Sequence, residues 1–404
     1  MTRLTTVPPG ERRPAGGRDP YLRLNRLLDT GSLRRVHPED DLSAVAVRGR
    51  VAGAEVIAFC AGGEIGMGEC LRIAHATDLA AAEDRPVIGV WHPGGTRLDD
   101  GVEALDGAGR VFAAMVRASG KVPQISVVLG PAAHGAAYGP ALTDLVIVAP
   151  DGGGPLIDPT GFGEGPQARH TGVVHMVAGS RDEALDEARR LIALLTRPGR
   201  FDPAPPAGLP PDAAPDPRAL LRALLDGGEL TEMQRHRAPG VVIGLGRLAG
   251  GTIGVVAGDP RREGGTLDGV GAEKVARFVR MCDSLGIPLV VVFDAPGELP
   301  SAREEWDGVM LRGAKLLYAF AEAVVPRVTL ITGRSADAMC VALNSRSLGA
   351  TKVFAWPDAD VAAMGDARYG VVDEVVTPGR TREKIAAALT AGVRRRGRHG
   401  NIPL

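Results

Sequence analysis

The sequence predicts an α/β protein built from two copies of one unit. Strand-like and helix-like segments alternate along the chain, which is typical of parallel sheets with crossover connections. The same order of strand, turn and helix then recurs, with Pro123 matching Pro326 and Gly130 matching Gly333, both at an offset of 203 (326 − 123 and 333 − 130). A Pro/Ala-rich stretch separates the two halves. Repetition in step at one offset indicates an internal duplication.

Composition limits the class of protein. With 404 residues the chain is long for one core, so two domains are expected. A net charge of −1 gives no reason to expect nucleic acid or an anionic membrane as a partner. No long apolar run is free of charges and turn residues, so a transmembrane span is not expected.

The domain division follows the composition along the chain. Residues 1–20 are rich in Pro, Gly and Arg and predict a disordered lead-in, without the apolar core of a secretion signal. We expect an N-terminal domain over 21–196, a linker stiffened by proline over 197–217, and a C-terminal domain over 218–404.

Hydrophobic periodicity assigns the elements of the first half. Short apolar runs with β-branched residues predict strands, and apolar positions at helical spacing predict helices. The strands are expected at Ala44–Val51, Glu55–Cys60 (after a turn at Gly53), Pro86–Val90, Ile125–Leu129 and Leu145–Ala149, and the helices at Tyr21–Leu28, Cys70–Ala82, Val102–Ala118 and Asp182–Thr196.

The second half repeats this order. The predicted strands are Thr252–Ala257, Pro288–Phe293 and Pro326–Ile331, and the predicted helices are Ala272–Leu285 and Gly308–Ala323. Two copies with a strand-to-helix turn at the same place predict two similar sites.

The turn after Ile125–Leu129 is the first of these candidate sites. It passes through Gly130-Pro131 into a run of small residues, 132–137, and on toward a helical pattern. Small residues let a ligand approach backbone N–H groups, and a helix start directs unpaired donors at it. The stretch therefore predicts either an oxyanion hole or a tight strand–helix junction without a ligand.

The four cysteines do not indicate a metal site. Cys60, Cys70, Cys282 and Cys340 are widely spaced and form no CxxC pair, which argues against a zinc ribbon. We expect small core residues in a reducing cytoplasm, not a catalytic thiol.

Several specific stretches carry a family resemblance. They are RLNRLLDTGSL, PVIGVWHPGGTRLDDGVEAL, SGKVPQISVVLGP, EKVARFVRMCDSLGIPLVVVFDAPGELP, RGAKLLYAFAEAVVPRVTLIT and RHGNIPL. From about Tyr21 to Leu404 the chain resembles the carboxyltransferase (β) subunits of biotin-dependent acyl-CoA carboxylases, of the propionyl-CoA and acetyl-CoA type. The resemblance implies a crotonase-like ββα superhelix fold in each of two tandem domains.

The resemblance also implies an activity. The family moves a carboxyl group from carboxybiotin, held on a separate biotin carboxylase/carrier subunit, to the α-carbon of an acyl-CoA. The N-terminal domain would hold the acyl-CoA and the C-terminal domain of a neighbouring copy the biotin, so at least a homodimer is expected, commonly within a hexamer. Fixed backbone N–H groups would stabilise the biotin and thioester oxyanions, and no metal is expected in this subunit.

Carried over residue by residue, the resemblance names two sets of candidates. On the thioester side it names the oxyanion residues His134, Gly135 and Ala136 and the acyl-CoA-binding residues Gly62, Gly63, Gly94, Gly95, Arg97 and Tyr138. On the biotin side it names the oxyanion residues Ala338 and Met339, together with Pro296, Gly297, Asp337 and Val341.

Both candidate holes depart from the family pattern. His134 stands at the first glycine position of one hole, where it could pack aside, crowd the thioester or act as an acid–base group. Asp337-Ala338-Met339 replaces Gly-Gly-Ala in the other, and an aspartate beside a developing anion would repel it. Pro93-Gly94-Gly95-Thr96-Arg97 is also altered, and the segments 151–167 and 364–372 are shorter than in the family.

These departures leave three functions open. The chain could be a working carboxyltransferase. It could be a biotin-independent acyl-thioester decarboxylase, or another enolate-forming enzyme, with His134 as proton donor. It could also be a non-catalytic subunit kept for assembly.

Overall fold

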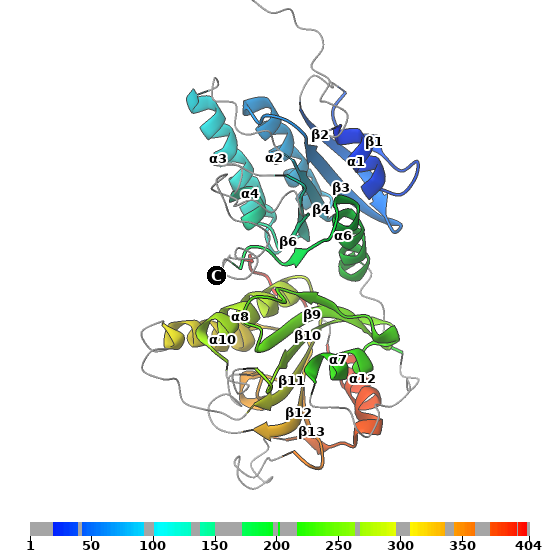
Figure 1. The fold of residues 1–404 in the computed structure, drawn as a ribbon, viewed down its shortest axis with the longest axis vertical. Coiled ribbons are helices and arrows are strands. Elements are labelled where there is room, and N and C mark those ends of the chain that lie inside the picture. The colour runs from blue at the N-terminus through cyan, green and yellow to red at the C-terminus, as the bar shows by residue number, and fades with distance from the viewer. Residues whose placement is uncertain are drawn as a thin grey trace, which may run out of the picture.

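The computed structural model describes most of the chain. The described residues are 19–38, 43–92, 101–130, 138–149, 172–196, 201–202, 216–262, 267–295, 308–335, 343–359, 372–393 and 395–401. They form two seven-stranded sheets, one in each half of the chain (Figure 1).

The first sheet has its strands in chain order. They are β1 (Arg34–Arg35), β2 (Ala44–Val51), β3 (Ala54–Ala61), β4 (Val87–Trp91), β5 (Gln124–Val128), β6 (Leu145–Val148) and β7 (Met176–Val177). β1, β2 and β3 pair antiparallel, whereas β3 to β7 pair parallel. The antiparallel pairs need only short turns, while each parallel pair needs a longer crossover.

The second sheet repeats this arrangement. Its strands are β8 (Thr231–Met233), β9 (Val241–Leu248), β10 (Gly251–Gly258), β11 (Leu289–Ala295), β12 (Arg327–Ser335), β13 (Lys352–Ala355) and β14 (Glu374–Val375). Again the first three pair antiparallel and the rest parallel. The predicted α/β class and the predicted internal repeat are therefore confirmed.

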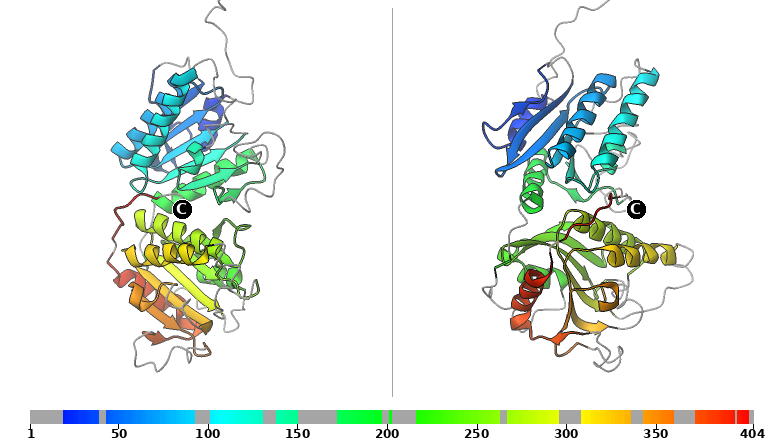
Figure 2. Two further views of the ribbon diagram at one scale, coloured as in Figure 1. Left: turned by 90° about the vertical axis from the view of Figure 1, so that its left-hand side faces the viewer. Right: turned by 180° about the vertical axis from the view of Figure 1, so that it is seen from behind.

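Helices cover both faces of each sheet (Figures 1 and 2). In the first half they are α1 (Pro20–Leu27), α2 (Met67–Ala82), α3 (Gly101–Ala118), α4 (Tyr138–Ala141) and α6 (Arg181–Thr196). In the second half they are α7 (Pro217–Leu224), α8 (Gly269–Ser284), α10 (Val309–Glu322) and α12 (Thr381–Ala391). Buried side chains of α1, α6 and α8 belong to one hydrophobic cluster, so the core continues from one half into the other.

Most predicted elements agree with the structure within a few residues. The clearest difference is β9, a largely apolar strand interrupted by Gly244 and Gly246, which was not predicted from the sequence. It pairs along its whole length with β10, and this pairing decides its state.

The predicted linker is wrong at two points. Phe201, in its first part, is buried, and its ring fills the space that a side chain at Gly251 would need. Pro217, its last residue, is the first residue of α7, with Asp216 as the N-cap. Proline is favoured at this helix position because its missing N–H would be unpaired there anyway. Among the described residues, no helix is long and apolar enough to cross a membrane.

Candidate functional site

The carboxyl ends of the parallel strands of the first sheet lie side by side. Ala61 of β3 is in register with Trp91 of β4, Trp91 with Val128 of β5, and Val128 with Val148 of β6. β3, β4 and β5 are each followed by a stretch that the sequence assigned to binding. Ligands of α/β proteins bind at this edge, beyond the carboxyl ends of the strands.

The second sheet presents a matching edge. Ala257 of β10 is in register with Val292 of β11, and Val292 with Leu330 of β12. The biotin-side candidates follow β11 and β12 in the sequence. The topology therefore directs the two candidate sets to corresponding edges of the two sheets.

Three of the candidate residues are described by the structure, namely Gly62, Gly63 and Tyr138. The others lie outside the described residues: His134, Gly135, Ala136, Gly94, Gly95, Arg97, Pro296, Gly297, Asp337, Ala338, Met339 and Val341. Their roles stay predictions.

Gly62 and Gly63 lie in a loop that is held by hydrogen bonds to Ser43 and Glu69. The Gly62 N–H donates to the Ser43 carbonyl (3.0 Å), and the Ser43 hydroxyl donates to the Glu64 carbonyl (2.7 Å). The buried Glu69 carboxylate accepts hydrogen bonds from the Gly66 N–H (3.0 Å) and the Ser43 hydroxyl (3.2 Å). A side chain at Gly63 would meet the Ser43 Cβ at 2.9 Å, so glycine is required for this close approach.

Tyr138 begins α4, directly after the predicted thioester turn. Its side chain is 60% exposed, and its ring lies edge-on to that of Phe112 of α3, with 6.2 Å between centroids. The neighbouring Gly139 packs against the buried Trp91 indole, whose N–H donates to the Ser126 hydroxyl at 3.0 Å. Tyr138 therefore presents an exposed aromatic surface on a firmly packed base.

His92 was not among the predicted site residues. It follows β4, is buried, and its ring fills the space beside Gly130, where an added Cβ would lie 2.2 Å from the imidazole Cδ2. Gly130 lies two residues after the end of β5, immediately before the predicted thioester turn. The imidazole therefore packs against the entrance of that turn.

Asp294 has the corresponding position in the second half. Its carboxylate fills the space beside Gly333 of β12, where an added Cβ would lie 2.2 Å from Oδ1. The offset from His92 is 202 (294 − 92), one less than that of the two glycines. The internal repeat was a signal that could have identified this pair. His92 directly precedes Pro93-Gly94, and Asp294 precedes Ala295-Pro296-Gly297. The two edges thus carry different side chains, an imidazole and a carboxylate.

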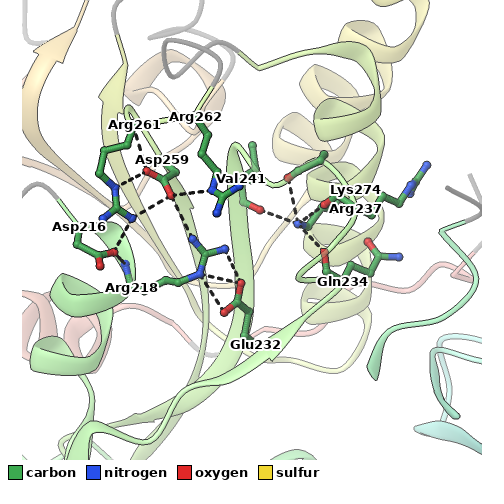
Figure 3. A network of polar contacts seen from close by, with 11 residues as sticks. Asp216, Arg218, Glu232, Gln234, Arg237, Val241, Asp259, Arg261, Arg262 and Lys274 are labelled. Atoms are coloured by element: carbon green, nitrogen blue, oxygen red, sulfur yellow. Dashed lines mark hydrogen bonds and ion pairs between the residues drawn. The ribbon is translucent and has the colours of Figure 1, made fainter. Parts of the chain in front are cut away.

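A polar network anchors the loop after β10 (Figure 3). The fully buried Asp259 carboxylate accepts hydrogen bonds from Arg218 (3.1 Å) and from Arg261 (2.9 Å). Arg218 also pairs with Glu232 at 2.7 Å. Burial opposes ionisation of Asp259, but the hydrogen bonds and charge of Arg261 and Arg218 hold its pKa below the usual value. The carboxylate thus stays ionised and fixes the start of the loop at the biotin-side edge.

Lys274 of α8 anchors a neighbouring loop in the same view (Figure 3). Its fully buried Nζ donates to the carbonyl oxygens of Val241 (2.6 Å), Arg237 (2.8 Å) and Gln234 (3.1 Å). Gln234 has a positive φ of 49° and donates its backbone N–H to the His175 carbonyl of the first half at 2.7 Å. Lys274 therefore stabilises a strained loop that joins the two halves.

The described cysteines are core residues, as predicted. Cys60, Cys70 and Cys282 are buried free thiols, and burial raises the pKa of Cys60 to about 12. A thiol with so high a pKa is a poor nucleophile near neutral pH. Within the described ranges, no group of three or more His, Cys, Asp or Glu side chains could hold a metal ion.

Comparison with known proteins identifies the family of this chain. Residues 40–368 match the carboxyl transferase domain. The chain is 44% identical to the biotin-dependent acetyl-/propionyl-coenzyme A carboxylase β6 subunit of Mycobacterium tuberculosis, over 96% of this chain and 97% of that protein. It is also 44% identical to the propionyl-CoA carboxylase β chain of Rhodococcus erythropolis, over 96% of this chain and 91% of that protein.

Two further matches bear on fold and function. Among solved structures, the transcarboxylase 12S hexamer matches with a TM-score of 0.85 and 29% identity, covering 95% of this chain and 91% of that one. This similarity confirms the expected crotonase-like fold. The methylmalonyl-CoA decarboxylase subunit α of Veillonella parvula is 32% identical, over 94% of this chain and 88% of that protein.

The alignment with the β6 subunit runs over 458 positions, more than the 404 residues of this chain, so the relative carries insertions. The match nevertheless extends over nearly all of both chains, and it includes both sheets with their carboxyl edges. The chain therefore belongs to the carboxyltransferase (β) subunit family of biotin-dependent acyl-CoA carboxylases.

Proposed function

We propose that this chain transfers a carboxyl group from carboxybiotin to the α-carbon of an acyl-CoA. The observation that supports this most directly is the pair of matching sheet edges, with strand ends in register in each half. A transfer between two carriers needs two oxyanion sites, and a duplicated unit supplies two. Family membership supplies the class of reaction.

The thioester would bind at the edge of the first sheet. In this proposal the backbone N–H groups of Gly135 and Ala136 stabilise the thioester oxygen as the α-carbon loses its proton. At Gly62 and Gly63 the absence of side chains would let the acyl-CoA approach the backbone closely, and Tyr138 would offer it an exposed aromatic ring. Gly94, Gly95 and Arg97 would complete the acyl-CoA site.

Biotin would bind at the edge of the second sheet. Carboxybiotin, carried on a separate subunit, supplies the carboxyl group and takes up the proton that leaves the α-carbon. Among the described residues the Asp294 carboxylate lies at this edge beside Gly333, where as an acceptor it would suit the N–H of a ureido ring and not its oxygen. The N–H groups of Ala338 and Met339 would face the ureido oxygen, with Pro296, Gly297, Asp337 and Val341 around them.

A second copy of the chain would bring the two edges together. Exposed apolar side chains lie on α3 and on α10, helices that precede the central strands β5 and β12: they are Val102, Leu105 and Val116, and Met310, Leu311 and Tyr318. Large exposed apolar patches mark interaction surfaces. The related 12S protein assembles as a hexamer. A homodimer, alone or within a larger ring, is therefore part of this proposal. The buried free thiols are consistent with the cytoplasm expected from the sequence.

The test is reconstitution. The purified chain is combined with a biotin carboxylase/carrier subunit, ATP, labelled bicarbonate and acetyl-CoA or propionyl-CoA, and the labelled acyl-CoA is measured. Gly135→Pro, which removes one oxyanion donor, should lower the rate by about 10²–10³-fold, whereas Gly135→Ala keeps the donor. No turnover of either acyl-CoA with an active carrier would contradict the proposal.

A second candidate function is carrier-free decarboxylation of an acyl thioester. The similarity to a methylmalonyl-CoA decarboxylase subunit supports decarboxylation of an acyl thioester, and His134 at the first hole supplies a candidate proton donor within the chain. It predicts CO2 release from malonyl-CoA or methylmalonyl-CoA without any carrier, and loss of that activity in His134→Gly. Binding of neither CoA thioester by calorimetry would instead favour the non-catalytic assembly subunit.

A further inference from the structure

We infer that the C-terminal segment 395–401, here named the C-terminal clasp, locks the two halves together and positions β5, the strand that leads to the thioester turn. The segment runs from the second half to the boundary between the halves, where the C label lies in Figures 1 and 2. Its positioning residue is Asn401. This inference rests on the proposed function for its kinetic consequence and on the described contacts for its geometry.

The clasp holds the first half through hydrogen bonds at the start of β5 and β6. The Asn401 N–H donates to the Ser119 hydroxyl at 2.8 Å, and its side-chain amide donates to the Asp144 carboxylate at 2.7 Å. The other oxygen of Asp144 accepts the Gln124 N–H, the first of β5, at 2.8 Å. Asn401 is therefore linked to β5 through one buried carboxylate.

The clasp holds the second half at the end of α8. His399 Nε2 lies 3.0 Å from the Asp283 carboxylate, and the Gly397 N–H donates to the Asp283 carbonyl at 2.9 Å. The Ser284 hydroxyl donates to the Asn401 side-chain oxygen at 3.1 Å. The Asn401 amide group therefore bridges both halves, donating to one and accepting from the other.

Backbone contact at Gly120 makes the fit specific. Gly120 has a positive φ of 68°, and a Cβ there would lie 1.9 Å from the His399 carbonyl oxygen. Arg396 reinforces the contact, since its guanidinium donates to the Gly120 carbonyl at 2.7 Å. Any side chain at position 120 must displace the clasp, because no real Cβ lies so close to a carbonyl oxygen.

The consequence for transfer follows from the two-copy site. If each site combines the first half of one copy with the second half of another, the angle between the halves within a copy sets how the two edges meet. Losing the clasp would leave each half folded and able to bind its own ligand. It would, however, misalign the reacting groups, and small errors in position cost large factors in rate.

The test compares two clasp variants with two matched controls. Asn401→Ala removes the bridge and Gly120→Ala collides with His399. Gly31→Ala carries the same backbone cost, since Gly31 has φ of 72°, but meets nothing within 4 Å. Arg398→Ala alters an exposed side chain of the same segment. Carboxyl transfer, acyl-CoA affinity by calorimetry and hydrogen exchange at Gln124–Val128 are measured for each.

We expect kcat for transfer to fall by about 10-fold or more in both clasp variants, with the acyl-CoA Kd changed by less than about twofold. Exchange at Gln124–Val128 should become faster, and both controls should match the wild type. Unchanged kcat, or an equal loss of kcat and affinity, would overturn the inference. If the wild type transfers no carboxyl group, the proposed function fails. Hydrogen exchange then decides the clasp, and unchanged protection at β5 in Asn401→Ala would refute it.

Discussion

Asp29 and Asp226 occupy the same position in the two halves, each holding the turn of a β-hairpin. Asp29 accepts hydrogen bonds from the N–H groups of Ala52 (3.0 Å) and Gly53 (2.7 Å). Asp226 does the same for Ala249 (2.9 Å) and Gly250 (2.8 Å), at an offset of 197 (226 − 29). Both Ala-Gly pairs have positive φ, which matches the twist of a two-residue hairpin.

An arginine from a distant helix completes each of these hairpin anchors. Arg189 of α6 pairs with Asp29 at 2.8 Å, and Arg382 of α12 pairs with Asp226 at 2.7 Å. Burial would raise the pKa of Asp29, but the Gly53 and Ala52 N–H groups and Arg189 together lower it below its usual value. The duplication has therefore kept the hairpin, its carboxylate and the helix that covers it.

We expect Asp226→Ala to destabilise the protein by about 1–3 kcal/mol, since it removes the acceptor of two turn N–H groups and the ion pair with Arg382. Urea unfolding followed by circular dichroism would measure this. Asp106→Ala is the control, because Asp106 forms an exposed i,i+4 pair with Arg110, worth about 0.5 kcal/mol or less. Equal losses in the two variants would contradict the assigned role.

Lys274→Met should be among the most destabilising single changes in the second half. It leaves the buried carbonyl groups of the loop before β9 without a donor, at a cost of about 2–4 kcal/mol. Lys315→Met is the matched control, since the Lys315 side chain is 30% exposed and, among the described residues, pairs with Glu273. Thermal melting should separate the two variants clearly, and a control as unstable as Lys274→Met would refute the prediction.

The stability contribution of Lys274 should depend on pH. Burial lowers its pKa to about 7 in the folded state, whereas the unfolded value is about 10.5. Between these values the unfolded chain binds the extra proton, so the free energy of unfolding rises with pH. The difference between wild type and Lys274→Met should therefore be larger at pH 9 than at pH 7. A difference that shrinks over this interval would contradict the shift.

Alanine at Gly130 and at Gly333 should affect the two sites separately. Gly130→Ala collides with His92 and should weaken acyl-CoA binding, whereas Gly333→Ala collides with Asp294 and should spare it. Both should lower carboxyl transfer by about 10-fold or more. Calorimetry with an acyl-CoA and the reconstituted assay test this.

Gly109→Ala serves as the control for these two changes. Gly109 lies within α3 with nothing within 4 Å of an added Cβ. Alanine there should stabilise the helix by about 0.5–1 kcal/mol and leave transfer intact. Equal effects of Gly130→Ala and Gly333→Ala on acyl-CoA binding would argue against two separate sites.

A charge on the exposed face of α10 should prevent assembly. Leu311 is 69% exposed in the single chain, and Leu311→Glu would place a carboxylate in the proposed interface between copies. We expect a monomer by light scattering and loss of transfer. Val375→Glu changes a residue of similar exposure on β14 and should leave the mass unchanged. A dimeric Leu311→Glu would move the interface elsewhere.

The predicted elements were most accurate where the sequence pattern was local. The strand Ala44–Val51 was predicted with the bounds that the structure shows, because its apolar, valine-rich run and the following Ala-Gly turn are short-range signals. β9 was missed because its glycines weaken any local preference, and its full-length pairing with β10 decides its state. Phe201 was assigned to a linker because its neighbours in the sequence are rich in proline. Its burial depends on packing against a distant part of the chain.

The candidate site divides in the same way. The sequence pointed to the stretches after β3, β4, β5, β11 and β12, since turn residues and family motifs are patterns of adjacent residues. It did not point to His92 and Asp294 or to the Asn401–Asp144 bridge. The two bridged residues are 257 positions apart, and no local pattern relates them.

By itself, the sequence determined the α/β class, the duplication, the family and the two turns on which the chemistry is proposed to depend. These follow from periodicity, small residues and repeated motifs, all of which act over short distances along the chain. Only the tertiary structure decided which side chain packs against each turn and how the two halves are joined. Those contacts arise from close packing between remote segments, where a single Cβ or carbonyl oxygen determines what fits.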